Sequence, residues 1–134
     1  MKLVKTDSEH FEHALFVKWF KATYPGVVIW CIPNGSKLPP QTVNKLKSEG
    51  LHTGAPDLEI PAWNVYLEMK KLDGKGKIYP EQIATIEYLR ANGKHAGIFH
   101  GCQQAIDFIE SIPKPANHVD YVEPPPKAPK IRKR

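Results

Sequence analysis

Apolar and polar residues recur at helical spacing over the first part of the chain. The apolar stripe consists of Phe11, Leu15 and Trp19, widened by Ala14, Phe16 and Phe20. A four-residue repeat of this kind places side chains on one face of an α-helix. Asp7 or Ser8 can cap its N-terminus, so we predict a helix that ends near Thr23, before the turn sequence YPG.

The pattern changes period several times beyond this helix. The run VVIWCI is β-branched and aromatic, which predicts a buried strand. PNGSKLPP predicts a loop, and QTVNKLKSEG predicts a short helix that ends before Gly50. The remaining predicted elements are two hairpin strands within 57–70, a helix over 80–92, a strand over 95–100 and a helix over 102–112. The order α-β-α-β-β-α-β-α indicates an α/β fold.

Length and composition fit one globular domain. The chain has 134 residues, of which 41% are hydrophobic. No apolar run approaches the about 20 residues of a membrane span, and we find no secretory signal. We therefore expect a cytoplasmic protein with no membrane partner. Cys31 and Cys102 form neither a disulfide framework nor a CxxC metal motif, and we interpret both as core residues.

Positive charge is concentrated in the C-terminal stretch. The net charge is +5, of which residues 113–134 carry +4 and residues 1–112 carry +1. The same stretch holds six prolines and few large apolar side chains, so it cannot build a core of its own. We predict a body over 1–112 and a Pro-rich basic tail over 113–134. The tail residues available to dock on the body are Val119, Tyr121 and Val122.

The hairpin sequence GAPDLEIPAWNVYLEMKK combines an apolar face with an acidic one. Side chains alternate along a strand, and the apolar face consists of Leu58, Ile60, Val65, Leu67 and Met69. Closing this face across the turn fixes the register. Asp57 then lies opposite Glu68, with Cβ atoms about 5 Å apart. Two like charges at that separation repel each other unless a cation binds between them.

The acidic face predicts metal-dependent chemistry. Two adjacent carboxylates offer the oxygen ligands that Mg²⁺ prefers. Lys70 projects from the same face as Glu68, where its ammonium can hold a water molecule and offset charge on a phosphate. Glu12, beside the stripe of the first helix, is a third candidate acid. Each residue alone is more commonly a solvated or turn residue, but together with Asp57 they favour phosphodiester hydrolysis.

Other features carry weaker signals. The two histidines of EHFEH do not make a zinc site without HExxH or CxxC. The sequence GKGK lacks P-loop spacing, and we interpret it as a flexible turn whose lysines approach a DNA backbone. Trp63 and Tyr66 either stack on a base or pack in the protein.

The motifs taken together resemble a known nuclease family. APD followed ten residues later by EMK, after a helix that carries a glutamate, is similar to the PD-(D/E)xK nuclease superfamily. The segments SEHFEHALFVKW, PNGSK, EGLHTGAPDLEIP, YLEMKK and YPEQIATIEYLRANG occur in this order over about residues 8–112. This wider pattern resembles the VRR-NUC family, the virus-type replication-repair nucleases.

The resemblance implies a restriction-endonuclease-like fold, a mixed sheet flanked by helices, that cuts DNA with Mg²⁺ or Mn²⁺. The residues that match the family's catalytic set are Asp57, Glu68, Lys70, Glu12 and Gln82. The implied metal ligands are Asp57, Glu68, Glu12 and the main-chain carbonyl of Met69. The expected DNA contacts are Asn34 and Lys37 in the PNG loop, with Lys71, Lys75 and Lys77.

Stand-alone phage members of this family are similar to Holliday-junction resolvases and form homodimers, which suits two symmetric cuts. The resemblance therefore implies a branched or duplex DNA partner in a bacterial host cell. The tail departs from the family pattern, and it either adds phosphate contacts or is solvated. The alternative hypothesis is a non-catalytic DNA-binding or assembly module on a nuclease fold. The intact set of Asp57, Glu68 and Lys70 argues against that alternative.

Overall fold

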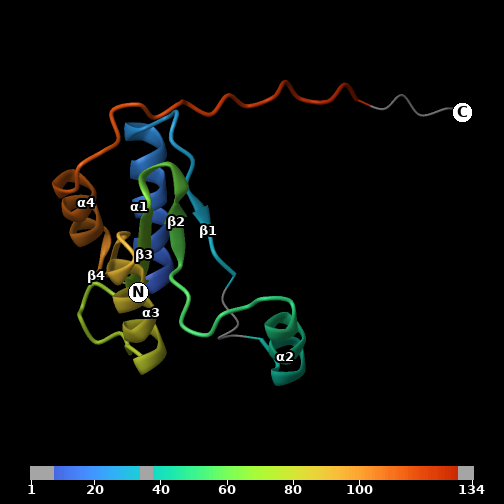
Figure 1. The fold of residues 1–134 in the computed structure, drawn as a ribbon, viewed down its shortest axis with the longest axis vertical. Helices are drawn as coiled ribbons and strands as arrows, with labels where there is room; N and C mark the ends of the chain where they lie inside the picture. Colours follow the sequence, from blue (N-terminus) through green and yellow to red (C-terminus); the bar gives the residue numbers. More distant parts are fainter. Residues whose placement is uncertain (1–7, 34–37, 130–134) are drawn as a thin grey trace, which may run out of the picture.

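The computed structural model describes residues 8–33 and 38–129. Its elements are α1 (Glu9–Thr23), β1 (Trp30–Cys31), α2 (Pro40–Ser48), β2 (Leu58–Ile60), the 3-10 turn η1 (Pro61–Trp63), β3 (Val65–Lys70), α3 (Pro80–Ala91), β4 (His95–His100) and α4 (Cys102–Ser111) (Figure 1). The α/β class and the predicted order of helices and strands are confirmed. Ser8 caps α1, because its side chain accepts the Phe11 N–H at 3.0 Å.

The strands form one mixed sheet in the order β1-β2-β3-β4. β1 pairs antiparallel with β2 and β2 with β3, whereas β3 and β4 run parallel. Parallel neighbours need a crossover connection, and α3 lies in that connection. β3 lies between β2 and β4, and five of its six residues are buried. Glu68 and Lys70, the candidate site residues on β3, therefore belong to an interior strand of the sheet.

The buried stripe of α1 differs by one residue from the predicted stripe. Glu12, Phe16 and Phe20 are buried, while Phe11 and Leu15 are 40% and 43% exposed. α1 uses this face to pack against β3 and α4. The hydrophobic pattern missed the correct phase because a charged residue, Glu12, occupies one of the buried positions.

The predicted buried strand VVIWCI is largely wrong. Only Trp30 and Cys31 form a strand, at the edge of the sheet, and both are exposed. Val27 and Ile29 are buried, but they precede the strand. The interpretation of Cys31 as a core residue is therefore wrong, whereas Cys102 is buried as expected.

α2 is set apart from the sheet and the other helices in Figure 1. None of its residues is buried. It ends as predicted, with Gly50 just beyond it at φ +107°, a conformation that favours glycine. α2 therefore projects from the body of the protein and is joined to the sheet by the segment that leads into β2.

The described part of the tail extends away from the body without regular structure (Figure 1). The side chains expected to dock are exposed, at 86% for Val119, 57% for Tyr121 and 82% for Val122. The prediction that the tail docks on the body through these three side chains is therefore wrong. The tail contacts the body in two other ways: the Tyr121 N–H donates to the Gly26 carbonyl at 2.9 Å, and the Lys114 ammonium donates to the Ile109 carbonyl. Among the described residues, no helix combines the length and apolar character of a membrane span.

Candidate active site

The β2–β3 hairpin has the register that its apolar face predicted. Leu58 pairs with Leu67 and Ile60 pairs with Val65. The turn is η1 followed by Asn64, which adopts a left-handed conformation at φ 57°. Such a conformation is tolerated by asparagine better than by most side chains. Asp57, directly before β2, is consequently brought to the same end of the sheet as Glu68.

The two charged residues of β3 are buried almost as deeply as its apolar residues. Glu68 is 1% exposed and Lys70 is 5% exposed, while Met69, on the opposite face, is 0% exposed. Removing a carboxylate and an ammonium from water is costly unless both find partners. These two groups lie 3.7 Å apart, from Lys70 Nζ to Glu68 Oε1.

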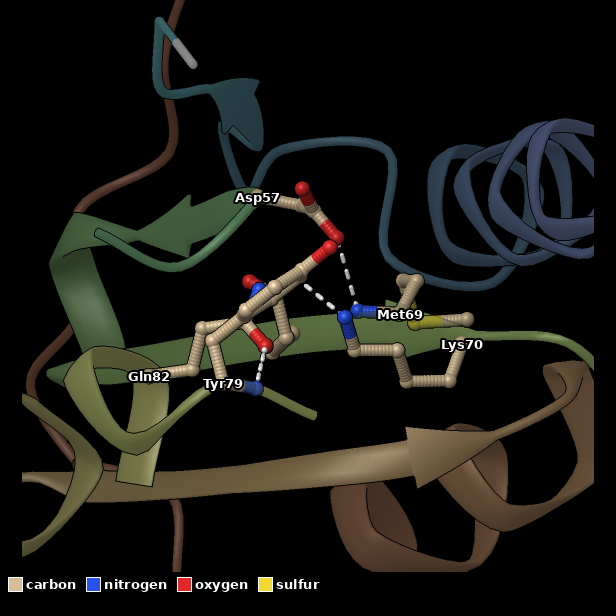
Figure 2. Close-up of polar contacts among 6 residues, drawn as sticks. Asp57, Met69, Lys70, Tyr79 and Gln82 are labelled. Carbon is tan, nitrogen blue, oxygen red and sulfur yellow. Dashed lines mark hydrogen bonds and ion pairs between the residues drawn. The ribbon is translucent and has the colours of Figure 1, made fainter. Parts of the chain in front are cut away.

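Two further residues hold the acids in place. Asp57 Oδ2 accepts the Met69 N–H at 2.8 Å, which ties the acid of the β2 side to the backbone of β3 (Figure 2). Gln82 is buried and donates from Nε2 to Glu68 Oε1 at 3.0 Å. Its other amide atom, Oε1, accepts the Tyr79 N–H at 3.0 Å. The amide of Gln82 therefore connects the start of α3 to Glu68.

Glu68 is electrostatically strained in the absence of a cation. Its Oε2 atom is buried and has no hydrogen-bond partner among the described residues. Burial and the nearby negative charges of Asp57 and Glu9 raise the pKa of Glu68 from 4.5 to about 8, although the Lys70 ammonium opposes the change. A buried carboxylate oxygen without a hydrogen-bond partner is free to coordinate a metal ion.

Glu9, and not Glu12, is the α1 acid that meets the hairpin acids. Carboxylate oxygens of Glu9, Asp57 and Glu68 all lie within 4.8 Å of one another. Glu12 Oε1 instead accepts the Cys102 N–H at 2.8 Å, at the first residue of α4. Extending the true buried stripe of α1 one turn towards its N-terminus would have found Glu9.

These residues fit a hard divalent cation. Three carboxylates converge from α1, the start of β2 and β3, and oxygen is the ligand atom that Mg²⁺ and Mn²⁺ prefer. The unpartnered Oε2 of Glu68 is accounted for by such an ion. The acidic group could therefore bind a metal, and the structure favours Glu9 over Glu12 as its third member.

A cavity of about 550 Å³ opens beside the acids. Its lining includes Glu9, Glu68 and Lys70, with Lys47 of α2 on another wall. Gly54 holds the segment after α2 against α3: it has φ +88°, and an added Cβ would lie 2.5 Å from the Glu81 carbonyl oxygen. The close approach of these two backbones fixes one wall of the cavity next to the candidate site.

The lysines expected to contact DNA are placed differently from one another. Lys77 lines the cavity, and its Nζ lies 5.1 Å from the centre of the Tyr79 ring. Lys71 and Lys75 are exposed in the turn between β3 and α3 and do not line the cavity. Asn34 and Lys37 lie outside the described residues.

Comparison with known proteins supports the fold. A solved structure described as a VRR_NUC domain protein matches with a TM-score of 0.63 and 24% sequence identity. The match covers 82% of this chain and 88% of that chain. No family model matches the sequence, and no curated protein matches it. At this level of identity the likeness establishes a shared fold, so the α/β architecture of a mixed sheet flanked by helices, which the sequence resemblance implied, is confirmed.

Proposed function

We propose that this protein is a metal-dependent DNA endonuclease that hydrolyses phosphodiester bonds. The observation that carries the proposal is the group formed by the buried Glu68 and Lys70 with the half-buried Asp57, in which Glu68 Oε2 lacks a partner among the described residues. A structural ion pair would be expected to satisfy both oxygens of a buried carboxylate. The fold shared with a VRR_NUC domain protein supports the same activity.

The metal ligands would be the Asp57, Glu68 and Glu9 carboxylates, with the main-chain carbonyl of Met69 as a further candidate. Mg²⁺ or Mn²⁺ bound there would polarise a phosphate oxygen and lower the pKa of a coordinated water. Glu12, proposed as a ligand from the sequence, has the role of holding the N-terminus of α4.

Each of the remaining site residues has a distinct proposed role. Lys70 would orient the attacking water and offset the negative charge that develops on the phosphate, because its ammonium lies at the edge of the acidic group. Gln82 would hold Glu68 in its ligating rotamer through the Nε2–Oε1 hydrogen bond. Lys77, in the cavity wall, would contact the DNA backbone, with Lys71 and Lys75 further out.

The substrate and assembly belong to the same proposal. We infer branched DNA as the preferred substrate and a homodimer as the active form, because a four-way junction requires two symmetric cuts. The setting would be phage DNA replication, repair or recombination in the cytoplasm of a bacterial cell. These features are supported by the resemblance of the motifs around Asp57 and Gln82 to the VRR-NUC family.

The test is cleavage of four labelled substrates of matched sequence: a linear duplex, a single strand, a 5′ flap and a four-way junction. Each is incubated with Mg²⁺, Mn²⁺ or EDTA. The variant Lys70→Met removes the ammonium but keeps the length of the side chain, and Lys18→Met, at an exposed position of α1, is the matched control. We expect Lys70→Met to slow cleavage roughly 100-fold or more, the scale of losing one preorganised charge-stabilising group.

The outcomes separate the possibilities. Paired symmetric cuts in the junction, lost with EDTA and with Lys70→Met, would support a resolvase. Cutting of flaps or single strands would keep the catalytic assignment and change the substrate. Cleavage by Lys70→Met at the wild-type rate would refute the role of Lys70. Binding without cutting in either metal would favour the non-catalytic DNA-binding or assembly module.

A further inference from the structure

Tyr79 is an exposed aromatic residue beside the candidate active site. It is 47% exposed and lines the same cavity as Glu68 and Lys70. Trp63 and Tyr66, the two aromatic residues that the sequence suggested for stacking on a base, are not placed to do so. Trp63 is 4% exposed, with its ring packed against Tyr24, while Tyr66 pairs with Glu59 across the hairpin and does not line the cavity.

The position of Tyr79 is fixed relative to Glu68. Tyr79 precedes Pro80, which restricts its backbone to an extended conformation, observed at φ −92° and ψ 149°. Its N–H donates to Gln82 Oε1, and Gln82 Nε2 donates to Glu68 Oε1. In Figure 2 the Tyr79 side chain extends from the start of α3 toward the end of the site that holds Asp57. Two hydrogen bonds through Gln82 thus connect the backbone of Tyr79 to the carboxyl group of Glu68.

The environment of the Tyr79 ring suits a nucleotide. Lys77 Nζ lies 5.1 Å from the ring centre, so a cation and an aromatic face are presented together. Proteins that bind unpaired nucleic acid combine such stacking surfaces with basic groups. The cavity, of about 550 Å³, is within the roughly 300–1,000 Å³ range of small-molecule sites and bears Lys47 on another wall.

A base inside a continuous duplex has both faces covered by its neighbours. The Tyr79 ring can therefore stack only on a base that has left the helix or lies at a break in it. We propose that Tyr79, with Lys77, forms a stacking platform for one unpaired nucleotide next to the scissile phosphate, which selects DNA that is unpaired or interrupted at the cut. This inference rests on the proposed nuclease function and narrows its substrate.

The test measures binding separately from cleavage. Two matched DNA molecules are used, a continuous duplex and the same duplex with one unpaired 2-aminopurine nucleotide, with Ca²⁺ replacing Mg²⁺ to limit hydrolysis. Dissociation constants are measured for wild type, Tyr79→Ala, Tyr79→Phe and Tyr88→Ala. Tyr88 is the matched control, because it lies on α3, the helix that directly follows Tyr79, is 68% exposed and does not line this cavity.

Wild type should prefer the interrupted duplex by roughly 5- to 150-fold, the range for stacking one base. Tyr79→Ala should lose that preference and the accompanying quenching of 2-aminopurine fluorescence, whereas Tyr79→Phe and Tyr88→Ala should keep both. Equal affinity of wild type for the two DNA molecules, or a preference that survives Tyr79→Ala, would overturn the platform.

The binding and cleavage experiments test the stacking platform and the proposed nuclease function separately. Lys70-dependent cleavage together with a preference that Tyr79→Ala leaves unchanged would refute the platform and keep the nuclease. A Tyr79-dependent preference without cleavage in Mg²⁺ or Mn²⁺ would establish the binding surface and refute the nuclease.

Discussion

Replacing Glu68 by glutamine should stabilise the metal-free protein at alkaline pH. The folded-state pKa of Glu68 is raised to about 8 from 4.5, chiefly by burial. The unfolded chain therefore releases this proton at lower pH than the folded chain does. The contribution of protonated Glu68 to stability is fully present below about pH 4.5 and is lost as the pH rises through about 8.

The size of the effect follows from that difference in pKa. Each pKa unit is worth about 1.4 kcal/mol, so the full loss is on the order of 5 kcal/mol, an upper bound because water and side chains relax around an ionised group. Glutamine has nearly the shape of the protonated acid, and its carbonyl can still accept from Gln82 Nε2. The Glu68→Gln variant should therefore lack the pH-dependent loss.

The assay is urea unfolding of wild type and Glu68→Gln in EDTA between pH 5 and pH 9. Taking the difference between the two proteins at each pH cancels the titration of groups that they share. We expect the stability of the variant relative to wild type to increase steadily with pH. At pH 8.5 the advantage of the variant should reach several kcal/mol. A difference that stays constant across the range would refute the assignment of a strained Glu68.

Three further outcomes distinguish the ligands from the residues that position them. Gln82→Met should weaken Mn²⁺ binding about 10- to 100-fold, measured by calorimetry, because Glu68 loses its orienting donor. Glu9→Gln should abolish most of the Mn²⁺-dependent rise in Tm with little change in the Tm of the metal-free protein. Glu12→Ala should instead destabilise the metal-free protein by about 1–3 kcal/mol in urea, since the buried N–H of Cys102 loses its acceptor. Equal effects of the Glu9 and Glu12 substitutions on metal binding would contradict this division of roles.

The hairpin was predictable because local rules determine it. Alternation of apolar residues fixes the faces of β2 and β3, and closing the apolar face sets Leu58 opposite Leu67. The same rule places Asp57 near Glu68. The ends of α2 and α3 were also predictable, because Gly50 and Gly93 both adopt positive φ just beyond them.

The errors arose where a distant residue decides the outcome. The phase of α1 depends on Glu12, whose partner Cys102 is 90 residues away in the sequence. A hydrophobicity scale assigns Glu12 to the surface. The stripe predicted from apolar residues alone is therefore shifted by one residue from the stripe that is buried. β1 is short for a similar reason: VVIWCI has the composition of a central strand, but its position at the edge of the sheet leaves Trp30 and Cys31 exposed.

Two buried glutamates show which property separates a functional acid from a structural one. Glu12 and Glu68 are 5% and 1% exposed, so burial alone does not distinguish them. Glu12 accepts a backbone N–H at the start of α4, while Glu68 has a buried oxygen without a donor among the described residues and two acids as neighbours. Ionisation of a carboxyl group in this position opposes folding unless a cation binds. The unsatisfied oxygen of Glu68, more than its depth, is therefore the strongest structural argument for the proposed metal site.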